Sequence, residues 1–578
     1  MNFNFSFLKI SRIKIVSFCI IFFGLVLIAK LFYVQVIHSN SYSETADRQY
    51  STPSSDIFER GSIFFNDKNN NLVSAAVQTL GYKIAINPTK ITNAENLYKE
   101  LLVNIPLLDH DTFILQAQKK NDMYEEITHR LSKEQADNIS ALKITGVSVF
   151  KEKWRFYPGE NLASHTLGFV GYKGDELAGR YGLERYYNPV LSRDKDNPYI
   201  NFFAEVFSNI NDSVFKNNSG NGDIVTTIEP TVQGFLETKL NDVSKMYQAD
   251  SIGGIIMNPT DGSIYAMTVK PDFNLNNFSK DNVSVFSNPL VENVFEFGSV
   301  FKPLVMAGAL DAGVVTADTK YNDKGSVTIE NKVISNFDKK ARGPGTTMQD
   351  VLTQSLNTGM VYVYQHLGKQ RMHDYLMADG IKDKTGIDLP NETSGLVSNL
   401  DSNLKNSRDI EYANASFGQG IAMTPIEMVR ALASLSNGGN LVVPHVVKEI
   451  KYENGSTKEI SYPTVRTKIS EATSEEITRM MVTVMDKSFD KLSPGIERYS
   501  IAAKTGTAQV AKPNGAGYYE DRHTHSFIGF FPAYNPKFII FLYAVNPKGV
   551  QYASQTWASP FLDIAKFLIN YYEVPPDR

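Results

Sequence analysis

The stretch that decides the fold and chemistry of this chain is residues 298–313, which read GSVFKPLVMAGALDAG. Ser299 and Lys302 stand three positions apart, just before Pro303, which favours the first turn of a helix, and an apolar run follows. Positions i and i+3 share one helix face, so the sequence predicts that the Lys302 amine lies within hydrogen-bond reach of the Ser299 hydroxyl. A serine hydroxyl needs an adjacent base, and a lysine can be that base where burial and neighbouring cations lower its pKa.

A Ser-x-x-Lys tetrad is a weak signal by itself. The letters SVFK begin at Ser148, Ser213 and Ser299, and a surface serine and lysine explain most such copies. Only the copy at Ser299 combines a preceding glycine, a following proline and a long apolar pattern of helical spacing. Context therefore selects Ser299 and Lys302 as the candidate nucleophile and base.

Two further motifs supply groups for the same chemistry. Ser355-Leu356-Asn357 lies between stretches with helical spacing, where a turn presents a hydroxyl for proton relay and an amide for a substrate backbone. Lys504-Thr505-Gly506-Thr507 follows an apolar strand start, and Gly506 lets a ligand backbone approach the strand without a side-chain clash. We expect the N–H groups of Ser299 and Thr507 to form an oxyanion hole.

A second Lys-Thr-Gly stands at Lys384-Thr385-Gly386, directly before Ile387–Pro390. We interpret this copy as a loop entering a turn, with a structural role. The order Ser-x-x-Lys, Ser-x-Asn, Lys-Thr-Gly is the combination typical of penicillin-binding proteins and class A β-lactamases. Each motif is common, but all three in this order and in fitting contexts are hard to obtain by chance.

Composition excludes several classes of protein. The 578 residues carry 58 Lys and Arg against 62 Asp and Glu, a formal net charge of −4, so nucleic acid is not an expected partner. The single cysteine, Cys19, excludes an intrachain disulfide and a cysteine-built metal site. The nine histidines show no metal-ligand spacing, so we expect no metal and no cofactor.

The N-terminal segment predicts a membrane anchor. The apolar run Ile15–Ala29 reaches the roughly 20 residues of a bilayer span if it extends to Ile37 with Lys30 snorkelling to the headgroups. Cations cluster before the span, which favours a cytoplasmic tail at 1–14, a single transmembrane helix at 15–37 and an extracytoplasmic remainder. A cleavable signal peptide is the alternative, but no small-residue cleavage site follows the run.

Hydrophobic periodicity predicts an α+β fold, with strands at both ends of the C-terminal region and helices between them. The expected strands are Gly81–Ile86, Asp223–Ile228, Ser251–Met257, Ser263–Val269, Ser500–Val510, Ser526–Phe531 and Phe538–Val545. The expected helices are Pro303–Ala312, Met348–Leu367, Pro425–Asn437 and Trp557–Tyr572.

With these motifs in place, the chain resembles a class B penicillin-binding protein, a membrane-anchored peptidoglycan DD-transpeptidase. The supporting stretches are Arg60-Gly61-Ser62-Ile63, Arg155–Gly171, Gly182-Leu183-Glu184, Phe417–Pro425, Asn437-Gly438-Gly439 and Ser526–Pro532. The sequence departs from the family pattern at Phe64–Asp67, which replaces Asp-Arg-x-Gly, and at Glu296-Phe297-Gly298, which replaces Glu-Pro-Gly. The first departure leaves the details of the N-terminal domain open.

The resemblance implies an elongated, mixed, dimerisation-type pedestal at 38–245 and a penicillin-binding transpeptidase domain at 246–572, followed by a tail at 573–578. In that domain an antiparallel sheet would pack against helices. Asn546-Pro547-Lys548 and Val574-Pro575-Pro576 resemble division-type more than elongation-type members.

The implied reaction is acyl transfer through a Ser299 acyl-enzyme. Lys302 takes the serine proton, and Ser355 and Lys504 relay a proton to the departing D-alanine. Asn357, Thr505, Gly506 and Thr507 are expected to hold the donor peptide. The implied partners are peptidoglycan stem peptides, β-lactams, the membrane, a glycan polymerase and division proteins.

Three alternatives stay open. An elongation-type transpeptidase of the same class differs only in its place in the cell. A serine β-lactamase shares the three motifs but needs about half this length. A β-lactam sensor, or a non-catalytic scaffold in a division complex, would bind without turnover.

Overall fold

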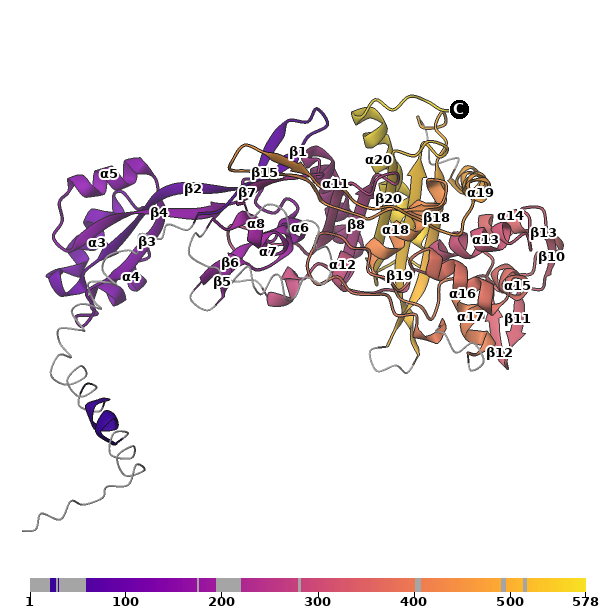
Figure 1. The fold of residues 1–578 in the computed structure, drawn as a ribbon, viewed down its shortest axis with the longest axis horizontal. Helices are drawn as coiled ribbons and strands as arrows, with labels where there is room; N and C mark the ends of the chain where they lie inside the picture. Colours follow the sequence, from indigo (N-terminus) through magenta and orange to yellow (C-terminus); the bar gives the residue numbers. More distant parts are fainter. Residues whose placement is uncertain are drawn as a thin grey trace, which may run out of the picture. The chain divides into compact units, whose positions relative to one another are not determined.

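The computed structural model describes residues 21–27, 30, 59–173, 176–193, 220–278, 282–400, 407–489, 495–512 and 517–578. These residues form two compact units, one comprising Thr79–Trp154 and the other comprising Glu59–Gln78 together with Arg155–Arg578 (Figure 1).

The predicted anchor at 15–37 lies outside the described residues except for 21–27 and 30, which are helical. Across the described part of the chain, no helix has both the length and the apolar character that a membrane span requires.

The smaller unit, Thr79–Trp154, is a small sheet with helices. Strand β2 (Leu72–Ile86) pairs antiparallel with β3 (Glu125–Leu131) and also pairs with β4 (Val147–Phe156). The helices are α3 (Ala94–Leu102), α4 (His110–Ala117) and α5 (Lys133–Ala141). Their apolar faces bury Leu101, Phe113 and Ile139 in one core with the strands.

The larger unit is built on a five-stranded antiparallel sheet of order β18-β19-β20-β8-β9. Its strands are β8 (Ser251–Met257), β9 (Ile264–Lys270), β18 (Ala502–Ala511), β19 (Tyr518–Phe531) and β20 (Phe538–Val545). Strand β20 reads FIIFLYAV without polar alternation because both faces of the sheet are covered.

Alternate residues of these strands enter two separate cores. Ile540 and Leu542 pack with α11 (Pro230–Tyr247) and α20 (Ala553–Tyr571), whereas Ile539 and Phe541 pack on the opposite face with the helices that carry the candidate site. Figure 1 shows the sheet between these two helical layers.

The helices on the second face include α13, which is buried on nearly all sides. They are α12 (Pro289–Glu292), α13 (Lys302–Asp311), α14 (Met348–Thr353), α15 (Asn357–Leu367), α16 (Lys369–Ala378), α17 (Asp409–Ala415), α18 (Pro425–Ser436) and α19 (Glu471–Phe489). Short strand pairs extend this layer: β10 (Lys320–Asp323) with β13 (Gly343–Thr347), and β11 (Ser326–Ile329) with β12 (Lys332–Ser335).

A second sheet in the larger unit joins segments that are far apart in sequence. Strand β1 (Ile63–Asn66) pairs with the start of β2 and, in parallel, with β7 (Gly222–Thr226). Beyond β7 lies the hairpin of β15 (Val447–Tyr452) and β16 (Thr457–Glu459). The C-terminal half of the chain therefore contributes strands to the sheet that begins at Ile63.

Beside this sheet lies a buried cluster of ionised side chains. Glu184, on α7 (Gly182–Tyr186), accepts hydrogen bonds from Arg60 Nε at 2.5 Å and from Arg155 Nε at 2.6 Å. Arg60 also donates to the Glu184 backbone oxygen at 2.6 Å, and Arg155 donates to the Gly61 oxygen at 2.7 Å. All three side chains are almost fully buried. Each comes from a different stretch that supports the family resemblance, so these three stretches meet in one ion-pair network.

The predicted mixture of an antiparallel sheet and helices is confirmed, with local differences, one of which is that β2 starts at Leu72 rather than Gly81. The stretch Met348–Leu367 forms two helices separated by the expected turn at Ser355, whose left-handed φ of +55° no helix can contain. Strand β19 starts at Tyr518 rather than Ser526, since its first half, YYEDRHTH, is polar and lacks an apolar pattern. Helix α20 starts at Ala553 rather than Trp557.

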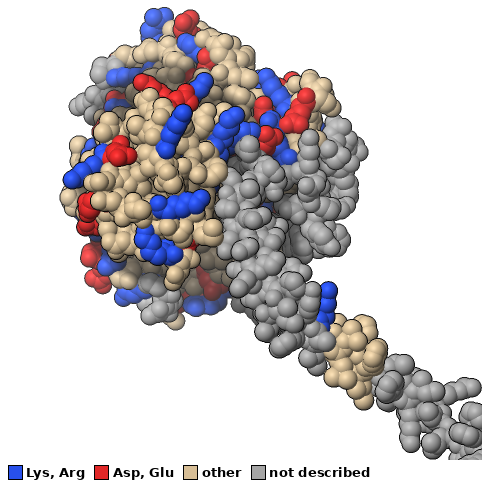
Figure 2. Space-filling model, turned by 90° about the vertical axis from the view of Figure 1, so that its left-hand side faces the viewer, with Lys and Arg blue, Asp and Glu red and all other residues tan. Residues whose placement is uncertain are grey.

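Figure 2 shows described residues of both charge signs on the face that it draws. On the face drawn in Figure 2, lysines and arginines lie among aspartates and glutamates, in keeping with the net charge of −4.

Candidate active site

Ser299 lies in a short 3-10 turn, Gly298–Phe301, that leads directly into α13. Gly298 has a φ of +61°, and a Cβ at this position would lie 2.7 Å from the Thr507 carbonyl oxygen. A side chain at this position is therefore excluded both by the backbone and by strand β18. The glycine that precedes the serine thus lets the nucleophile turn sit directly against the Lys-Thr-Gly strand.

Lys302 is fully buried and donates three hydrogen bonds. Its Nζ lies 2.7 Å from the Ser355 backbone oxygen, 3.2 Å from Ser355 Oγ and 2.8 Å from Asn357 Oδ1. An ammonium has three donors, so these partners account for all of them. The predicted hydrogen bond between Lys302 and Ser299 is not among the bonds of the described residues, because Ser355 and Asn357 take its place.

Ser355 is the point where the two candidate lysines meet. Lys504 Nζ donates to Ser355 Oγ at 3.1 Å, so this hydroxyl contacts the ammonium groups of both Lys302 and Lys504. The left-handed backbone at Ser355 turns the chain between α14 and α15 and places Asn357 at the start of α15. Asn357 Nδ2 donates to the Ser335 oxygen at 3.0 Å, which fixes the orientation of the amide.

Burial changes the protonation of both lysines. It lowers the pKa of Lys302 well below the usual range, and the nearby charge of Lys504 lowers that pKa further. Burial alone lowers the pKa of Lys504 to about 7. Among the described residues neither lysine has an ion pair with a carboxylate. Both groups therefore have a neutral form that is accessible near neutral pH.

Strand β18 presents the Lys-Thr-Gly residues beside the nucleophile turn. A Cβ at Gly506 would lie 2.2 Å from the Phe297 oxygen and 3.0 Å from the Val300 nitrogen. Ser526 Oγ, on the paired strand β19, donates to the Phe297 oxygen at 2.8 Å and tightens this contact. Glycine at 506 is thus required for close packing of the strand against the serine turn, beyond the ligand approach expected from the sequence.

Thr505 and Thr507 are half-buried on β18, and their roles as ligand contacts stay a prediction. The Thr507 hydroxyl accepts a hydrogen bond at 3.1 Å from the backbone N–H of Ala553, the first residue of α20. Sequence reasoning missed this contact, because 46 positions separate the two residues.

The second Lys-Thr-Gly has a different environment. Thr385 N and Oγ1 and Gly386 N all donate to the carboxylate of Glu392, at distances of 2.5 to 3.1 Å. The Lys384 side chain is exposed, and its backbone oxygen accepts from Arg430. This copy forms a turn around a carboxylate, which agrees with its structural interpretation.

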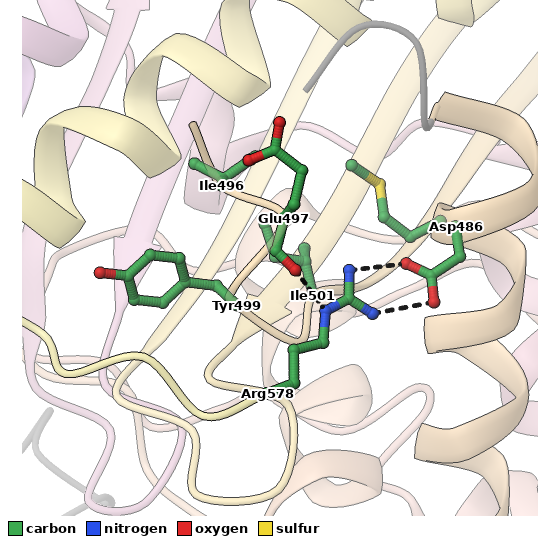
Figure 3. Close-up of a pocket in the computed structure, with 7 residues that line it drawn as sticks. Asp486, Ile496, Glu497, Tyr499, Ile501 and Arg578 are labelled. Carbon is green, nitrogen blue, oxygen red and sulfur yellow. Dashed lines mark hydrogen bonds and ion pairs between the residues drawn. The ribbon is translucent and has the colours of Figure 1, made fainter. Parts of the chain in front are cut away.

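A separate pocket of about 210 Å³ contains none of the predicted site residues. It is lined by Met485, Asp486, Ile496, Glu497, Tyr499, Ile501 and Arg578. Figure 3 shows the guanidinium of Arg578 paired with both carboxylate oxygens of Asp486, at 2.8 and 2.9 Å.

Comparison with known families gives two matches. The profile described as "Penicillin binding protein transpeptidase domain" matches residues 252–566. The profile described as "Penicillin-binding Protein dimerisation domain" matches residues 58–205.

Relatives match over nearly the full length of the chain. Stage V sporulation protein D of Bacillus subtilis is 29% identical over 549 residues, which cover 93% of this chain and 82% of the relative. Peptidoglycan D,D-transpeptidase FtsI of Buchnera aphidicola is 26% identical over 575 residues, which cover 98% of this chain and 96% of the relative.

Solved structures share the fold. Penicillin Binding Protein 2X from Streptococcus thermophilus superposes with a TM-score of 0.71 at 20% identity, covering 89% of this chain and 80% of that chain. Penicillin binding protein 3 from Mycobacterium tuberculosis, complexed with aztreonam, superposes with a TM-score of 0.67 at 21% identity, covering 90% and 98%. Since the transpeptidase profile alone covers more than half of the residues, the chain belongs to the penicillin-binding protein transpeptidase family.

Proposed function

We propose that this chain is a peptidoglycan D,D-transpeptidase that cross-links stem peptides through an acyl-enzyme on Ser299. The observation that carries the proposal is the pair of buried lysines, Lys302 and Lys504, which share the Ser355 hydroxyl next to the serine turn. The name of the Buchnera aphidicola relative, a peptidoglycan D,D-transpeptidase, supports the same activity.

In the first step, the Ser299 oxygen attacks the carbonyl carbon between two D-alanines of a donor peptide while neutral Lys302 takes its proton. The lowered pKa of Lys302 supports this role, because only the neutral amine accepts a proton. The N–H groups of Ser299 and Thr507 would stabilise the oxyanion. The C–N bond then breaks, and the departing D-alanine nitrogen receives a proton through Ser355, the hydroxyl that contacts both lysines.

In the second step, an amine of a neighbouring stem peptide attacks the ester carbonyl, gives up a proton and releases the Ser299 hydroxyl. Asn357, Thr505 and Thr507 would hold the donor amide and the terminal carboxylate beside Lys504. A charged Lys504 would gain a counterion when the carboxylate binds, which it lacks among the described residues of the free chain.

We place the enzyme in septal wall synthesis, because the relatives include FtsI and a sporulation protein. We also propose four finer features of the chain. They are an anchor at 15–37 with a cytoplasmic N-terminus, a pedestal at 38–245, a catalytic domain at 246–572, and docking of a glycan polymerase and division proteins. An elongation role is the alternative within the same activity.

Labelling with a fluorescent penicillin tests the function. The wild-type chain should take up label covalently, and Ser299→Ala should lose it. Ser148→Ala is a matched control, because exposed Ser148 begins an identical SVFK tetrad on β4 and should leave labelling unchanged. Equal labelling of wild type and Ser299→Ala would refute the assignment, and rapid turnover of nitrocefin would indicate a β-lactamase instead.

A further inference from the structure

Helix α20 begins against the Lys-Thr-Gly strand. The first backbone N–H groups of a helix have no partner inside the helix, and here the N–H of Ala553 donates to Thr507 Oγ1 at 3.1 Å. Ala553 is buried, so this N–H has no access to bulk water as an alternative partner.

Other bonds hold the first turn of α20 in this position. His525, which pairs with Thr507 across β18 and β19, has its Nδ1 2.8 Å from Thr556 Oγ1 and accepts a bond on its backbone oxygen from Trp557 Nε1 at 3.2 Å. Gln555 Oε1 accepts from the backbone N–H of Tyr552 at 2.9 Å and closes the start of the helix. The Ala553 N–H is thus fixed relative to the strand.

This bond determines what the Thr507 hydroxyl can do. A hydroxyl has one donor and two acceptor lone pairs. Because Ala553 occupies one lone pair, the O–H must point away from the helix and is free to donate to another acceptor. The positive end of a 19-residue helix dipole adds to the preference for an anion at this hydroxyl.

We propose that the backbone N–H of Ala553 is a positioning group of the reaction, which orients the Thr507 hydroxyl to donate to the terminal carboxylate of the bound peptide or β-lactam. The inference rests on the proposed function, since it requires a carboxylate beside Lys504 and Thr507. It adds a determinant of ligand binding from outside the three motifs, in a helix that contributes no side chain to the chemistry.

Ala553→Pro tests the role, because proline removes the N–H at the first helical position, where its fixed φ suits the helix. Tyr552, with φ −122° and ψ 145°, already has the backbone that a residue before proline prefers. In the full chain, we expect the noncovalent dissociation constant of benzylpenicillin to rise about 2- to 10-fold while the limiting acylation rate constant stays within about 2-fold. Ala553→Gly keeps the N–H and should bind like the wild type.

The Thr507 variants separate positioning from packing. Thr507→Ser should keep wild-type binding, and Thr507→Val should weaken it at least as much as Ala553→Pro. The double variant Thr507→Val/Ala553→Pro should bind no worse than Thr507→Val alone, because both changes remove the same hydroxyl contact. Additive losses, or a fall in the acylation rate constant with unchanged binding, would overturn the proposal.

Three further outcomes are decisive. If Ala553→Pro fails to fold, the comparison of Thr507→Ser with Thr507→Val takes its place, and equal penicillin binding by these two variants overturns the positioning role. A wild-type chain that penicillin does not label refutes the proposed function and this inference together. A labelled chain in which Ala553→Pro and Ala553→Gly bind equally refutes only the inference.

Discussion

Two places in the larger unit bury a pair of cations, and they do so in opposite ways. Beside the β1–β7 sheet, Arg60 and Arg155 both donate to Glu184, which is fully buried between them. At the candidate site, Lys302 and Lys504 both donate to the hydroxyl of Ser355, with no carboxylate partner among the described residues.

The difference lies in which groups can change their charge. Burial alone would raise the pKa of Glu184, but the charges of Arg155 and Arg60 outweigh it and lower that pKa, so the cluster stays ionised. Arginine remains protonated in proteins, so the ion pairs of Arg60 and Arg155 with Glu184 keep their charge. The lysines have only neutral partners, so burial lowers their pKa values and leaves the proton free to move. We infer that the first arrangement stabilises the fold and that the second serves the proposed acyl transfer.

The largest effect is expected at the second pair. Lys302→Gln retains an amide that can donate to Ser355 but removes the base, so acylation by penicillin should slow by about 10²–10⁴-fold. Stopped-flow acylation measures this loss, and Lys384→Gln is a matched control because that exposed lysine belongs to the structural Lys-Thr-Gly.

The thermal stability of Lys302→Gln should not fall with its acylation rate. Because Lys302→Gln keeps an amide that can donate to Ser355 and removes a buried amine whose protonated form has no counterion among the described residues, its thermal midpoint should equal or exceed that of the wild type. A midpoint well below the wild type, or acylation that survives, would mean that Lys302 serves the fold rather than the reaction.

A change at the arginine pair should lower the stability of the fold rather than the rate of acylation. Glu184→Ala leaves two guanidinium groups buried without a counterion, and we expect a loss of about 3–5 kcal/mol in the free energy of unfolding. Denaturant titration measures this loss. The exposed pair of Arg479 and Glu476 on α19 supplies the control, since Glu476→Ala should cost about 0–1 kcal/mol.

Labelling per folded molecule should be unchanged in Glu184→Ala. A Glu184→Ala variant with wild-type stability would show that the Arg60–Glu184–Arg155 network does not stabilise the fold. A folded variant that fails to label would connect the network to the site.

The sequence could predict this site because its chemistry is local. Ser299 and Lys302 lie within one helical turn, and a strand and a turn each carry the other groups in a short motif. The sheet strands were also predictable, since residues such as those of β20 are apolar throughout. The left-handed backbone at Ser355 was not, because serine has no preference for that conformation.

Long-range partners were beyond sequence reasoning for a different reason. Arg60, Arg155 and Glu184 were recognisable as landmarks, but nothing in their spacing indicates that they share one buried network. Ser526 and Ala553 act through bonds to Phe297 and Thr507, and such contacts depend on tertiary packing alone. The hydrogen bond expected between Lys302 and Ser299 is absent among the described residues for the same reason, since Ser355 and Asn357 accept from Lys302 instead.

The smallest effect concerns the coupling of the two lysines. The charge of Lys504 is one cause of the lowered pKa of Lys302. Lys504→Met removes that charge, so protonated Lys302 becomes less unfavourable and its pKa rises. A smaller fraction of Lys302 is then neutral at a given pH, and the rising limb of acylation against pH should move to the alkaline side.

The shift can be measured even though Lys504→Met also lowers the acylation rate, because the pH at the midpoint of the limb does not depend on the maximal rate. Acylation by a carboxylate-free electrophilic ester is the cleaner probe, since the variant also loses the cation that would hold a ligand carboxylate. The pKa of Lys504 itself, at about 7, adds a second titration in the wild type that the variant must lack. An unmoved midpoint would mean that burial alone lowers the pKa of Lys302. The two lysines would then contact the same hydroxyl while the charge of one leaves the pKa of the other unchanged.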